Sequence, residues 1–463
     1  MAAQFDRQAP VLIICHELVG AQMAGPGIRY YHLAHVLAQE FPVTLAVPAG
    51  SSLGPRGEFS VLTYHSGHDT ALEEAIRRAR AVLVPAVWLG LAPSLLETGV
   101  PLIIDGYDPF MAETFYLQPG DAADIQSALT RAYLAGDFFI CASERQRDWW
   151  LGLLEAHGRI NRHTLGEDAS LRRLIDVVPF GLPETPPHHT RSVVKGVWPG
   201  VGENDQVILW GGGLWPWLDP LTAIRAVAKV WETRQDVRLI FPGTRHPNPA
   251  MAGIPTHTEA ARALASRLEL LDRGVFFGDW VPYEDWPNVL LESDIALTLH
   301  YEDTLETRLA FRSRVLDYVW AGLPMVITRG DATSALIAEH GLGMVVNGEA
   351  VEAVAAALLH LLNTPRAIFS QRCETVRGSL TWGRAACPLI EFCRQPRRAP
   401  DKIALGEQLG NPFYVNEVTH LQEKVKFYEQ MRLIRLVRWL HPYRQRLKAL
   451  INSKRLPHWR SRA

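Results

Sequence analysis

Residues 10–40 read PVLIICHELVGAQMAGPGIRYYHLAHVLAQE. The run PVLIIC is apolar without alternation, which is typical of a strand buried on both faces of a parallel sheet. A glycine-containing turn follows, and from residue 28 apolar side chains recur at helical spacing, along a stripe of Ile28, Tyr31, His32, His35 and Val36. The segment therefore predicts a strand–turn–helix unit, from which α/β proteins are built.

The same alternation continues along the chain. Further apolar runs stand at residues 43–48, 81–85, 101–105, 138–141 and 176–181, with helical patterns such as 70–80 and 143–156 between them. Residues 182–190, LPETPPHHT, are rich in proline and polar side chains and indicate a linker. The pattern then restarts, with a helix at 219–232 that Asp219 caps and apolar runs at 206–213, 237–243, 275–280, 294–300 and 324–328.

This organisation predicts an α/β fold of two doubly wound, Rossmann-like domains that face each other across a cleft. We expect the first domain at residues 1–190 and the second at residues 191–395. A linker and a basic helical tail take residues 396–463. Ligands of such domains bind at the carboxyl ends of the parallel strands, so site residues are expected in the loops that follow the strands.

The composition is that of a soluble globular chain, with 463 residues, 48% apolar and 21% charged, and a net charge of −2. This balance gives no electrostatic attraction to nucleic acid. The five cysteines form no CxxC pair, so neither a disulfide framework nor a metal site is indicated. We expect a cytoplasmic protein, because the sequence shows no signal-peptide pattern and no apolar run of about 18 residues.

Charge is unevenly distributed along the chain. Residues 420–463 hold 12 Lys and Arg against 2 Asp and Glu, which leaves the rest of the chain acidic. Residues 427–462 place Arg432, Arg435 and Arg438 at helical spacing, with apolar residues mostly opposite. A basic amphipathic helix of this kind predicts peripheral association with the anionic inner face of the plasma membrane. Packing on the acidic body, or pairing with a second copy, explains the same pattern.

Two loops of the first half carry candidate site residues. Gly25 and Gly27 permit close backbone approach, and the helix that begins there offers free N–H groups to an anion or a sugar hydroxyl. Arg29 lies in its first turn, where a cation is unfavourable unless an anion is near; the alternative is a glycine turn with a solvated arginine. In IIDGYDPF, Asp105 and Asp108 follow a strand and could bind sugar hydroxyls or act as a base, with capping or a turn as the alternative.

In the second half, WGGGLWPWLDP joins a strand to a helix at residues 210–220. Gly212 and Gly213 would let a diphosphate approach the helix N-terminus, and Trp215 could stack on a sugar or a base. The loop holds no Lys or Arg, so the phosphate charge must be balanced elsewhere. Candidates for donor binding after the later strands are Arg245, Trp280 and Val281.

Residues 306–324, ETRLAFRSRVLDYVWAGLP, set three arginines among apolar residues. If the segment is one helix, Arg308 and Arg312 share a face, whereas Arg314 lies about 160° from Arg312 and can pair with Asp317. Such a helix has little solvated surface for guanidinium groups. Phosphate binding by Arg308 or Arg312 is therefore favoured over pure ion pairing.

Together these motifs resemble the retaining GT-B glycosyltransferases of family 4. GPGIRYYHLA, VVPFG, the GGG loop, VFFGDWVPYEDWPNVLLESDIAL and LDYVWAGLPMVITRGD stand in the order expected of that family, from residue 10 to about residue 395. The resemblance implies transfer of a sugar from a nucleotide diphosphate sugar to a glycan or lipid-linked acceptor, with retention and without a metal or cofactor. The ETR-x3-R-x-R pattern before LDY is similar to a branch that acts in cell-surface polysaccharide or O-antigen assembly.

The resemblance also implies residue roles, with some departures. Asp317 stands where the second of two family glutamates holds the nucleotide ribose, and Glu306 is the nearest replacement for the first, whose position is Leu309. The usual basic residues of the donor glycine loop are absent. Candidates for a diphosphate clamp are therefore Arg308, Arg312 and Arg245.

Asp105 or Asp108 occupies the place of the family's acceptor-domain histidine, and the leaving phosphate is another candidate to take the acceptor proton. Two other classes fit a double fold of this kind. A sugar-nucleotide epimerase would need an acid and a base on both sides of the sugar, and no convincing pair is evident. The missing first glutamate makes a non-catalytic nucleotide-sugar or glycan-binding protein the third hypothesis.

Overall fold

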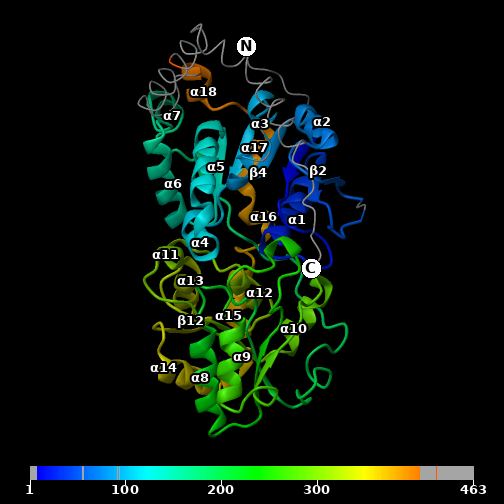
Figure 1. Cartoon of the computed structure of the whole chain (residues 1–463), viewed down its shortest axis with the longest axis vertical. Coiled ribbons are helices and arrows are strands. Elements are labelled where there is room, and N and C mark those ends of the chain that lie inside the picture. Colours follow the sequence, from blue (N-terminus) through cyan, green and yellow to red (C-terminus); the bar gives the residue numbers. More distant parts are fainter. Residues whose placement is uncertain (1–7, 55–56, 91, 93, 407–423, 425–463) are drawn as a thin grey trace, which may run out of the picture. The chain divides into compact units, whose positions relative to one another are not determined.

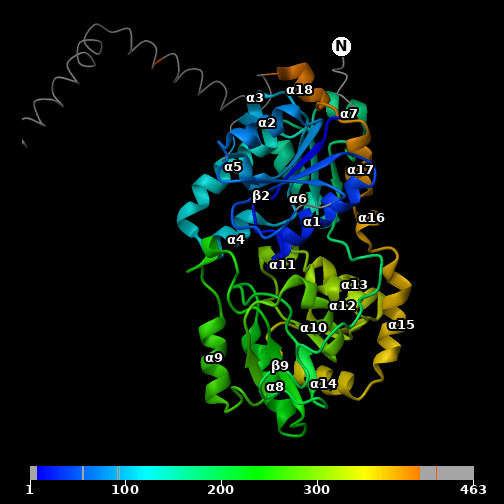
Figure 2. The same cartoon turned by 90° about the vertical axis from the view of Figure 1, so that its right-hand side faces the viewer.

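Apolar strands and helices alternate along the computed structural model, which describes residues 8–54, 57–90, 92, 94–406 and 424. They form two all-parallel sheets, each covered by helices on both faces (Figure 1, Figure 2). Both sheets belong to one compact unit that ends at Ala404. The predicted pair of doubly wound α/β domains is confirmed, whereas the predicted tail helix at 427–462 lies outside the described residues.

The first sheet has seven strands in the order β3-β2-β1-β4-β5-β6-β7. These are β1 (Val11–Ile14), β2 (Val43–Pro48), β3 (Ser60–Tyr64), β4 (Ala81–Pro85), β5 (Leu102–Asp105), β6 (Phe138–Cys141) and β7 (Ile175–Val177). Every residue of β1, β4, β5 and β6 is buried, because helices cover both faces. The strand order reverses between β1 and β4, where a doubly wound sheet opens a crevice for a ligand.

Helices on the two faces of the first sheet come from different parts of the chain. One face packs against α1 (Gly25–Ala38), α16 (Trp382–Ala385) and α17 (Cys387–Arg394). The other packs against α2 (Thr70–Arg78), α3 (Ser94–Glu97), α5 (Ala122–Ala135) and α6 (Glu144–Ala156). The remaining short helices are η1 (Ala86–Gly90), α4 (Phe110–Leu117), η2 (Pro119–Asp121) and α7 (Arg162–Glu167).

The buried face of α1 differs from the predicted stripe. Its most deeply buried apolar side chains are Tyr30, Leu33, Ala34 and Leu37. Most of the predicted stripe is half-buried on the neighbouring side of the helix, where the His32 ring stacks on Trp382 with centroids 5.1 Å apart.

The second sheet has six strands in the order β10-β9-β8-β11-β12-β13. They are β8 (Gln206–Leu209), β9 (Val237–Phe241), β10 (Val275–Phe277), β11 (Ile295–Thr298), β12 (Met325–Thr328) and β13 (Gly343–Val346). One face packs against α8 (Pro220–Trp231), α9 (Thr258–Arg267) and α14 (Val351–Leu362). The other packs against α10 (Trp286–Glu292), α12 (Arg314–Trp320), α13 (Ala332–His340) and α15 (Arg366–Arg377). Loops contain η3 (Pro249–Met251), η4 (Tyr283–Asp285) and α11 (Leu305–Leu309).

After α15 the chain returns to the first sheet. Trp382, Leu389 and Phe392 are buried in the same apolar cluster as Val11 and Ile13. Burial of each such side chain contributes about 1.5–3 kcal/mol. The end of the predicted second domain therefore completes the core of the first.

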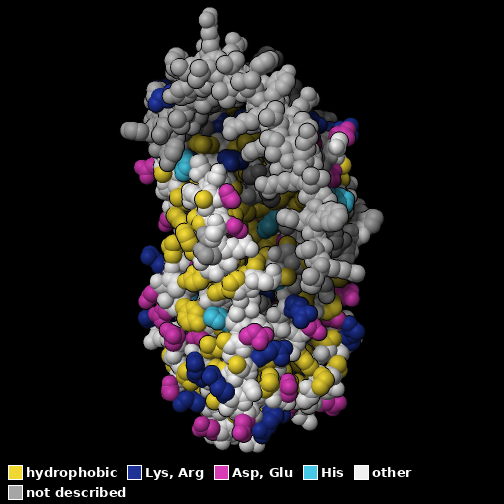
Figure 3. Space-filling model, viewed as in Figure 1, with side chains coloured by type: hydrophobic (Ala, Val, Ile, Leu, Met, Phe, Trp, Pro, Cys, Tyr) yellow, Lys and Arg dark blue, Asp and Glu magenta, His cyan; other side chains and the backbone are white. Residues whose placement is uncertain are grey.

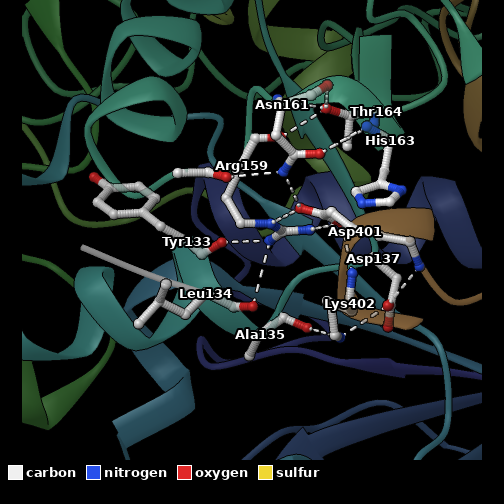
Figure 4. A network of polar contacts seen from close by, with 12 residues as sticks. Tyr133, Leu134, Ala135, Asp137, Arg159, Asn161, His163, Thr164, Asp401 and Lys402 are labelled. Atoms are coloured by element: carbon white, nitrogen blue, oxygen red, sulfur yellow. Dashed lines mark hydrogen bonds and ion pairs between the residues drawn. The ribbon is translucent and has the colours of Figure 1, made fainter. Parts of the chain in front are cut away.

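The last described helix, α18 (Pro400–Leu405), is fixed to the first sheet by polar contacts (Figure 4). The guanidinium of Arg159, fully buried, donates to both carboxylate oxygens of Asp401 at 2.7 and 3.2 Å. The Asp137 carboxylate accepts from the backbone N–H of Leu102 in β5 and of Ala399 before α18, both at 2.9 Å. These bonds join a late segment of the chain to the middle of the sheet.

The described surface carries both signs of charge. On the face in Figure 3, acidic and basic side chains are interspersed over the second sheet. Within the ranges the structure describes, no helix combines the length and apolar character needed to span a bilayer. A search of the same residues finds no group of three or more His, Cys, Asp or Glu placed to hold a metal ion.

Candidate active site

A cavity of about 590 Å³, which we call the main cavity, lies between the carboxyl ends of the two sheets. Its lining contains His16 after β1, Asp108 after β5, Gly211 after β8 and Thr298, the last residue of β11. It therefore touches the place where strand order reverses in each sheet, between β1 and β4 and between β8 and β11. Ligands of doubly wound sheets bind at such positions.

The glycine loop after β8 forms one wall of the cavity. Gly212 and Gly213 lie in the lining, as predicted, and Gly212 has φ +126°, which favours glycine. Trp215 also lines the cavity and stacks on Trp217 with ring centroids 5.7 Å apart. The wall thus combines open backbone with an aromatic surface.

Arginines of the segment 306–324 stand beside this loop, but the segment is not one helix. It contains α11 and α12, with Ala310 extended at ψ 148° between them. The break brings Arg312 and Arg314 into the cavity lining and leaves Arg308 exposed outside it. Arg308 therefore lies apart from the cavity that the predicted clamp would line, whereas Arg314 lies in its lining.

Both lining arginines have carboxylate partners. Arg312 donates to the two carboxylate oxygens of buried Glu306 at 2.6 and 2.8 Å. Burial lowers the pKa of Arg312, but the Glu306 carboxylate raises it by more, so the pKa lies above its ordinary value and the guanidinium stays charged. Arg314 donates to Asp317 at 2.8 Å, as predicted, and its guanidinium lies 4.8 Å from the ring centroid of Trp286.

Two residues predicted to contact the donor, Glu306 and Asp317, instead bind the two arginines. Glu306 is absent from the described lining, and its two oxygens hold Arg312, so it positions the arginine and does not face a sugar. Asp317 is likewise outside the lining and also accepts from the Trp286 indole N–H at 2.9 Å. The geometry gives it an orienting role on Arg314.

The remaining predicted donor residues lie close to this wall. Trp280 lines the main cavity, and together with Val281 and Arg314 it lines a small adjoining pocket of about 20 Å³. Arg245 lies in a separate neighbouring cavity of about 370 Å³, which Trp215 and Trp280 also line. It is exposed and outside the lining of the main cavity.

The opposite wall begins with the N-terminus of α1. Gly25 lines the cavity, and a Cβ built there would meet no atom within 4 Å. Gly27 is a packing residue, because its Cβ would come within 2.4 Å of the carbonyl oxygen of Leu18. The helix starts at Gly25, with Pro26 in its first turn, as suits a position that donates no helical hydrogen bond.

Arg29 and Asp105 form a buried ion pair. The guanidinium donates to the two carboxylate oxygens at 2.7 and 3.0 Å and to the carbonyls of Val178 and Pro179. Both side chains are fully buried and outside the cavity lining. The structure thus corrects the predicted phosphate role of Arg29 and catalytic role of Asp105: the pair fixes α1 to the end of β5 and to the segment that follows the edge strand β7.

Asp108 has the environment expected of an acid or base. It is half-buried in the cavity lining. Burial raises its pKa to about 7, and the carboxylates of Asp105 and Glu306 add to the shift. At neutral pH its two protonation states are therefore both populated.

Glu113, on α4, was not predicted. It lines the cavity beside Asp108 and Arg312, and burial raises its pKa well above the ordinary value, with Asp108 and Glu306 raising it further. Its sequence context, FMAETFYL, carries no turn or glycine signal. Lining residues His16 and His246 were also missed, although each closely follows a predicted strand.

Comparisons with known proteins agree with this architecture. Residues 205–364 match the family model described as Glycosyl transferases group 1. No curated protein matches the chain in sequence. Sucrose-phosphate synthase from Thermosynechococcus elongatus is similar in structure, with a TM-score of 0.59 and 13% identity over 83% of this chain and 98% of that one.

Two further solved structures are similar. WaaG, a glycosyltransferase involved in lipopolysaccharide biosynthesis, gives a TM-score of 0.56 at 15% identity, over 83% of this chain and 100% of that one. HepE from Anabaena, solved in complex with UDP and glucose, gives 0.59 at 13% identity, over 84% and 100%. The chain therefore has the GT-B fold, and its residues 205–364 carry a glycosyl transferases group 1 domain.

Proposed function

We propose that the protein is a glycosyltransferase that moves a sugar from a nucleotide diphosphate sugar to a glycan or lipid-linked acceptor. The observation that carries this proposal is the pairing of Arg312 and Arg314 with the open glycine loop on one wall of the cavity. Guanidinium groups and backbone N–H groups can hold a diphosphate there without a metal. The family match of residues 205–364 and the UDP bound to HepE support the same donor class.

In this proposal the nucleotide lies along the second sheet. Its base sits near Trp280 and Val281, where the small pocket adjoins the main cavity, and its diphosphate faces Arg314. Asp317 and the Trp286 indole hold Arg314 in place. Preorganised positive charge stabilises the departing nucleoside diphosphate, where negative charge develops.

The transfer then forms one bond and breaks one. The acceptor hydroxyl oxygen bonds to the anomeric carbon as the bond from that carbon to the diphosphate oxygen breaks, on the same face for retention. The acceptor proton passes to the leaving phosphate or to Asp108, whose pKa of about 7 permits exchange at neutral pH. Membrane association of residues 427–462, cytoplasmic location, a role in cell-surface polysaccharide assembly and independence of metals stay predictions.

Calorimetric titration with nucleoside diphosphates and their sugars tests the donor wall. Arg314→Gln should weaken the preferred nucleotide at least tenfold, about 1.4 kcal/mol, whereas Arg308→Gln on the exposed surface should not. Arg314 is the cleaner choice, because removing Arg312 would leave Glu306 buried without its cation. Equal binding by wild type and Arg314→Gln would contradict the clamp.

Turnover separates the three functional classes. A transferase releases nucleotide steadily only when donor and acceptor are both present. Conversion of the donor sugar without an acceptor would indicate an epimerase. Donor binding with neither reaction, across a broad acceptor set, would indicate a non-catalytic binding protein.

A further inference from the structure

One part of the main cavity lining is apolar and draws on both sheets. From helices of the first sheet and from the loops after β8 and β9, it includes Phe110, Leu117, Ile125, Trp217, Met251 and Ile254. The two sides meet at α4, because Leu117 packs against the apolar cluster of the second sheet and the ring of Tyr116 lies 6.2 Å from that of Trp217. The apolar lining therefore continues from one sheet to the other.

Helix α4 turns a largely uncharged face to the cavity. Its lining residues stand at the spacing of one helix face and are Phe110, Glu113, Thr114 and Leu117. The Thr114 hydroxyl donates to the Phe110 carbonyl at 2.7 Å, so its hydrogen is used within the helix. Burial and neighbouring carboxylates raise the pKa of Glu113 well above its ordinary value, which favours the uncharged acid. The face that α4 presents to a ligand is therefore mainly apolar.

The indoles of this lining have little free ring face for stacking on a sugar. Trp215 stacks on Trp217 at an interplanar angle of 14°, and the His246 ring lies 5.9 Å from that of Trp215. A Cβ built on Gly213 would come within 2.9 Å of the Trp215 indole nitrogen, so the loop backbone also lies against this ring. Sugar recognition through ring stacking is therefore restricted here.

The aliphatic side chains favour a hydrocarbon ligand over sugar hydroxyls. Leu117, Ile125 and Ile254 neither donate nor accept hydrogen bonds. A hydroxyl buried against them would lose its hydrogen bonds to water without replacement. A hydrocarbon chain has no such bonds to lose, and its removal from water is favourable.

The apolar surface continues outside the cavity. Beyond the lining, α4 exposes Phe115 at 61% and Tyr116 at 38% of the full side-chain surface. Figure 3 shows apolar side chains gathered around the position that α4 occupies in Figure 1. Adjacent large apolar side chains on a protein surface mark a site of interaction with another apolar group. These two residues thus extend the lining from the active site towards solvent.

We propose that the acceptor carries a hydrocarbon chain, which leaves the main cavity between α4 and the loops that hold Trp217 and Met251. The inference rests on the proposed function and narrows it, because it selects a lipid-linked acceptor over a free glycan. In this arrangement the acceptor sugar lies near Asp108, and the chain passes along Leu117 towards Phe115. Leu117 and Phe115 then determine acceptor specificity through the chain and not through the sugar.

Glycosides that share one sugar and differ in chain length test the inference. The probes are methyl, hexyl and octyl β-glucoside, kept below the concentrations at which they form micelles. Ligand-detected NMR titrations of the full chain, saturated with a nucleoside diphosphate that it binds, give the three affinities. Octyl glucoside should bind at least tenfold more tightly than methyl glucoside, with hexyl glucoside between them. Equal affinities, or no binding of octyl glucoside, would overturn the inference.

Variants assign the effect to α4. Phe115→Ser and Leu117→Ser each remove apolar surface from the path, so the ratio of octyl to methyl glucoside affinity should fall at least threefold. Val197→Ser removes an apolar side chain of similar exposure, 56%, outside the cavity lining and should leave the ratio unchanged. Phe115→Ser decides the result if Leu117→Ser does not fold, because Phe115 is largely exposed. A ratio that Phe115→Ser leaves unchanged, or that Val197→Ser lowers equally, would overturn the path.

Photolabelling locates the chain independently. Octyl glucoside with a diazirine near the end of its alkyl chain should label residues 110–125 or 251–254 in the nucleotide-bound protein. Unmodified octyl glucoside should suppress this labelling, and methyl glucoside should not. Labelling confined to other residues would contradict the proposed path.

The outcomes separate this inference from the proposed function. If a nucleotide binds and chain length has no effect on glucoside affinity, the lipid-linked acceptor is overturned while the donor site stands. If no nucleoside diphosphate binds to the wild type, the proposed function itself fails. A chain-length dependence measured without nucleotide would then indicate a hydrocarbon-binding groove with no acceptor role.

Discussion

Replacing Asp105 with asparagine should lower thermal stability and leave nucleotide affinity unchanged. Asn keeps the size of the side chain but removes the charge that balances Arg29, whose guanidinium is fully buried. The carbonyls of Val178 and Pro179 then remain as its acceptors, and neither carries a negative charge. Removal of one partner from a buried ion pair costs about 3–5 kcal/mol.

That loss is large enough to measure. The first sheet and its helices comprise roughly 200 residues, and in a domain of that size each kcal/mol lowers the melting temperature by about 2–4 °C. The expected shift is therefore about 6–20 °C. Thermal scans at a single heating rate, followed by circular dichroism, give the shift, and calorimetry with a nucleotide gives the affinity. The donor wall belongs to the second sheet, so its affinity should not change in protein that is still folded.

Two further variants make the reasoning testable. Arg29→Met combined with Asp105→Asn leaves no unpaired ion, so its loss should be smaller than the sum of the single losses by at least about 1 kcal/mol. Asp108→Asn makes the same chemical change three residues later, where Asp108 has no ion-pair partner among the described residues, and should not lower stability near neutral pH. A folded Asp105→Asn protein with wild-type melting temperature and abolished transfer would refute the structural role and restore the catalytic one.

Three other outcomes are expected. Burial raises the pKa of Asp108 from 3.8 to about 7, so between these pH values the folded state holds one proton more than the unfolded state, and the free energy of unfolding should fall as pH rises through this range. Urea titrations of wild type and Asp108→Asn between these pH values measure the difference. If the free energies of unfolding of the two proteins change equally with pH, the raised pKa is contradicted. Gly27→Ala should destabilise the protein, since its Cβ would press on the Leu18 carbonyl, whereas Gly25→Ala should melt like wild type. Of five cysteines only Cys387 is exposed, so Ellman's reagent should modify one thiol rapidly in the native protein and five after unfolding; two fast thiols would contradict the burial of the others.

The central strands were predictable because each is a continuous apolar run buried on both sides. β3 and β13 were missed, and both are edge strands. In β3, SVLTY, only Tyr64 is buried, and in β13, GMVV, only Val346 is. An edge strand needs fewer apolar residues, so its pattern is hard to distinguish from a loop.

The sequence predicts the parts of the site that are formed by a glycine-rich backbone loop. It predicts less well the roles of side chains that depend on which residue each one pairs with in the folded protein. The glycine loop at 211–213 was found from its composition alone. The pairing of Arg29 with Asp105 joins residues 76 positions apart, which sequence spacing cannot show. One continuous helix over residues 306–324 predicts that Arg308 and Arg312 share a face. The backbone leaves the helical conformation at Ala310, so this angular relation does not hold, and no sequence signal marks the break.

The return of the chain to the first sheet affects the order in which the protein can mature on the ribosome. N-terminal domains of nascent chains usually fold first. Here the cluster around Val11 lacks Trp382, Leu389 and Phe392 until residues 206–377, which contain the entire second sheet, have been translated. The second sheet can therefore reach its native state while one apolar face of the first sheet is still uncovered. During this period chaperone binding or self-association would compete with correct folding.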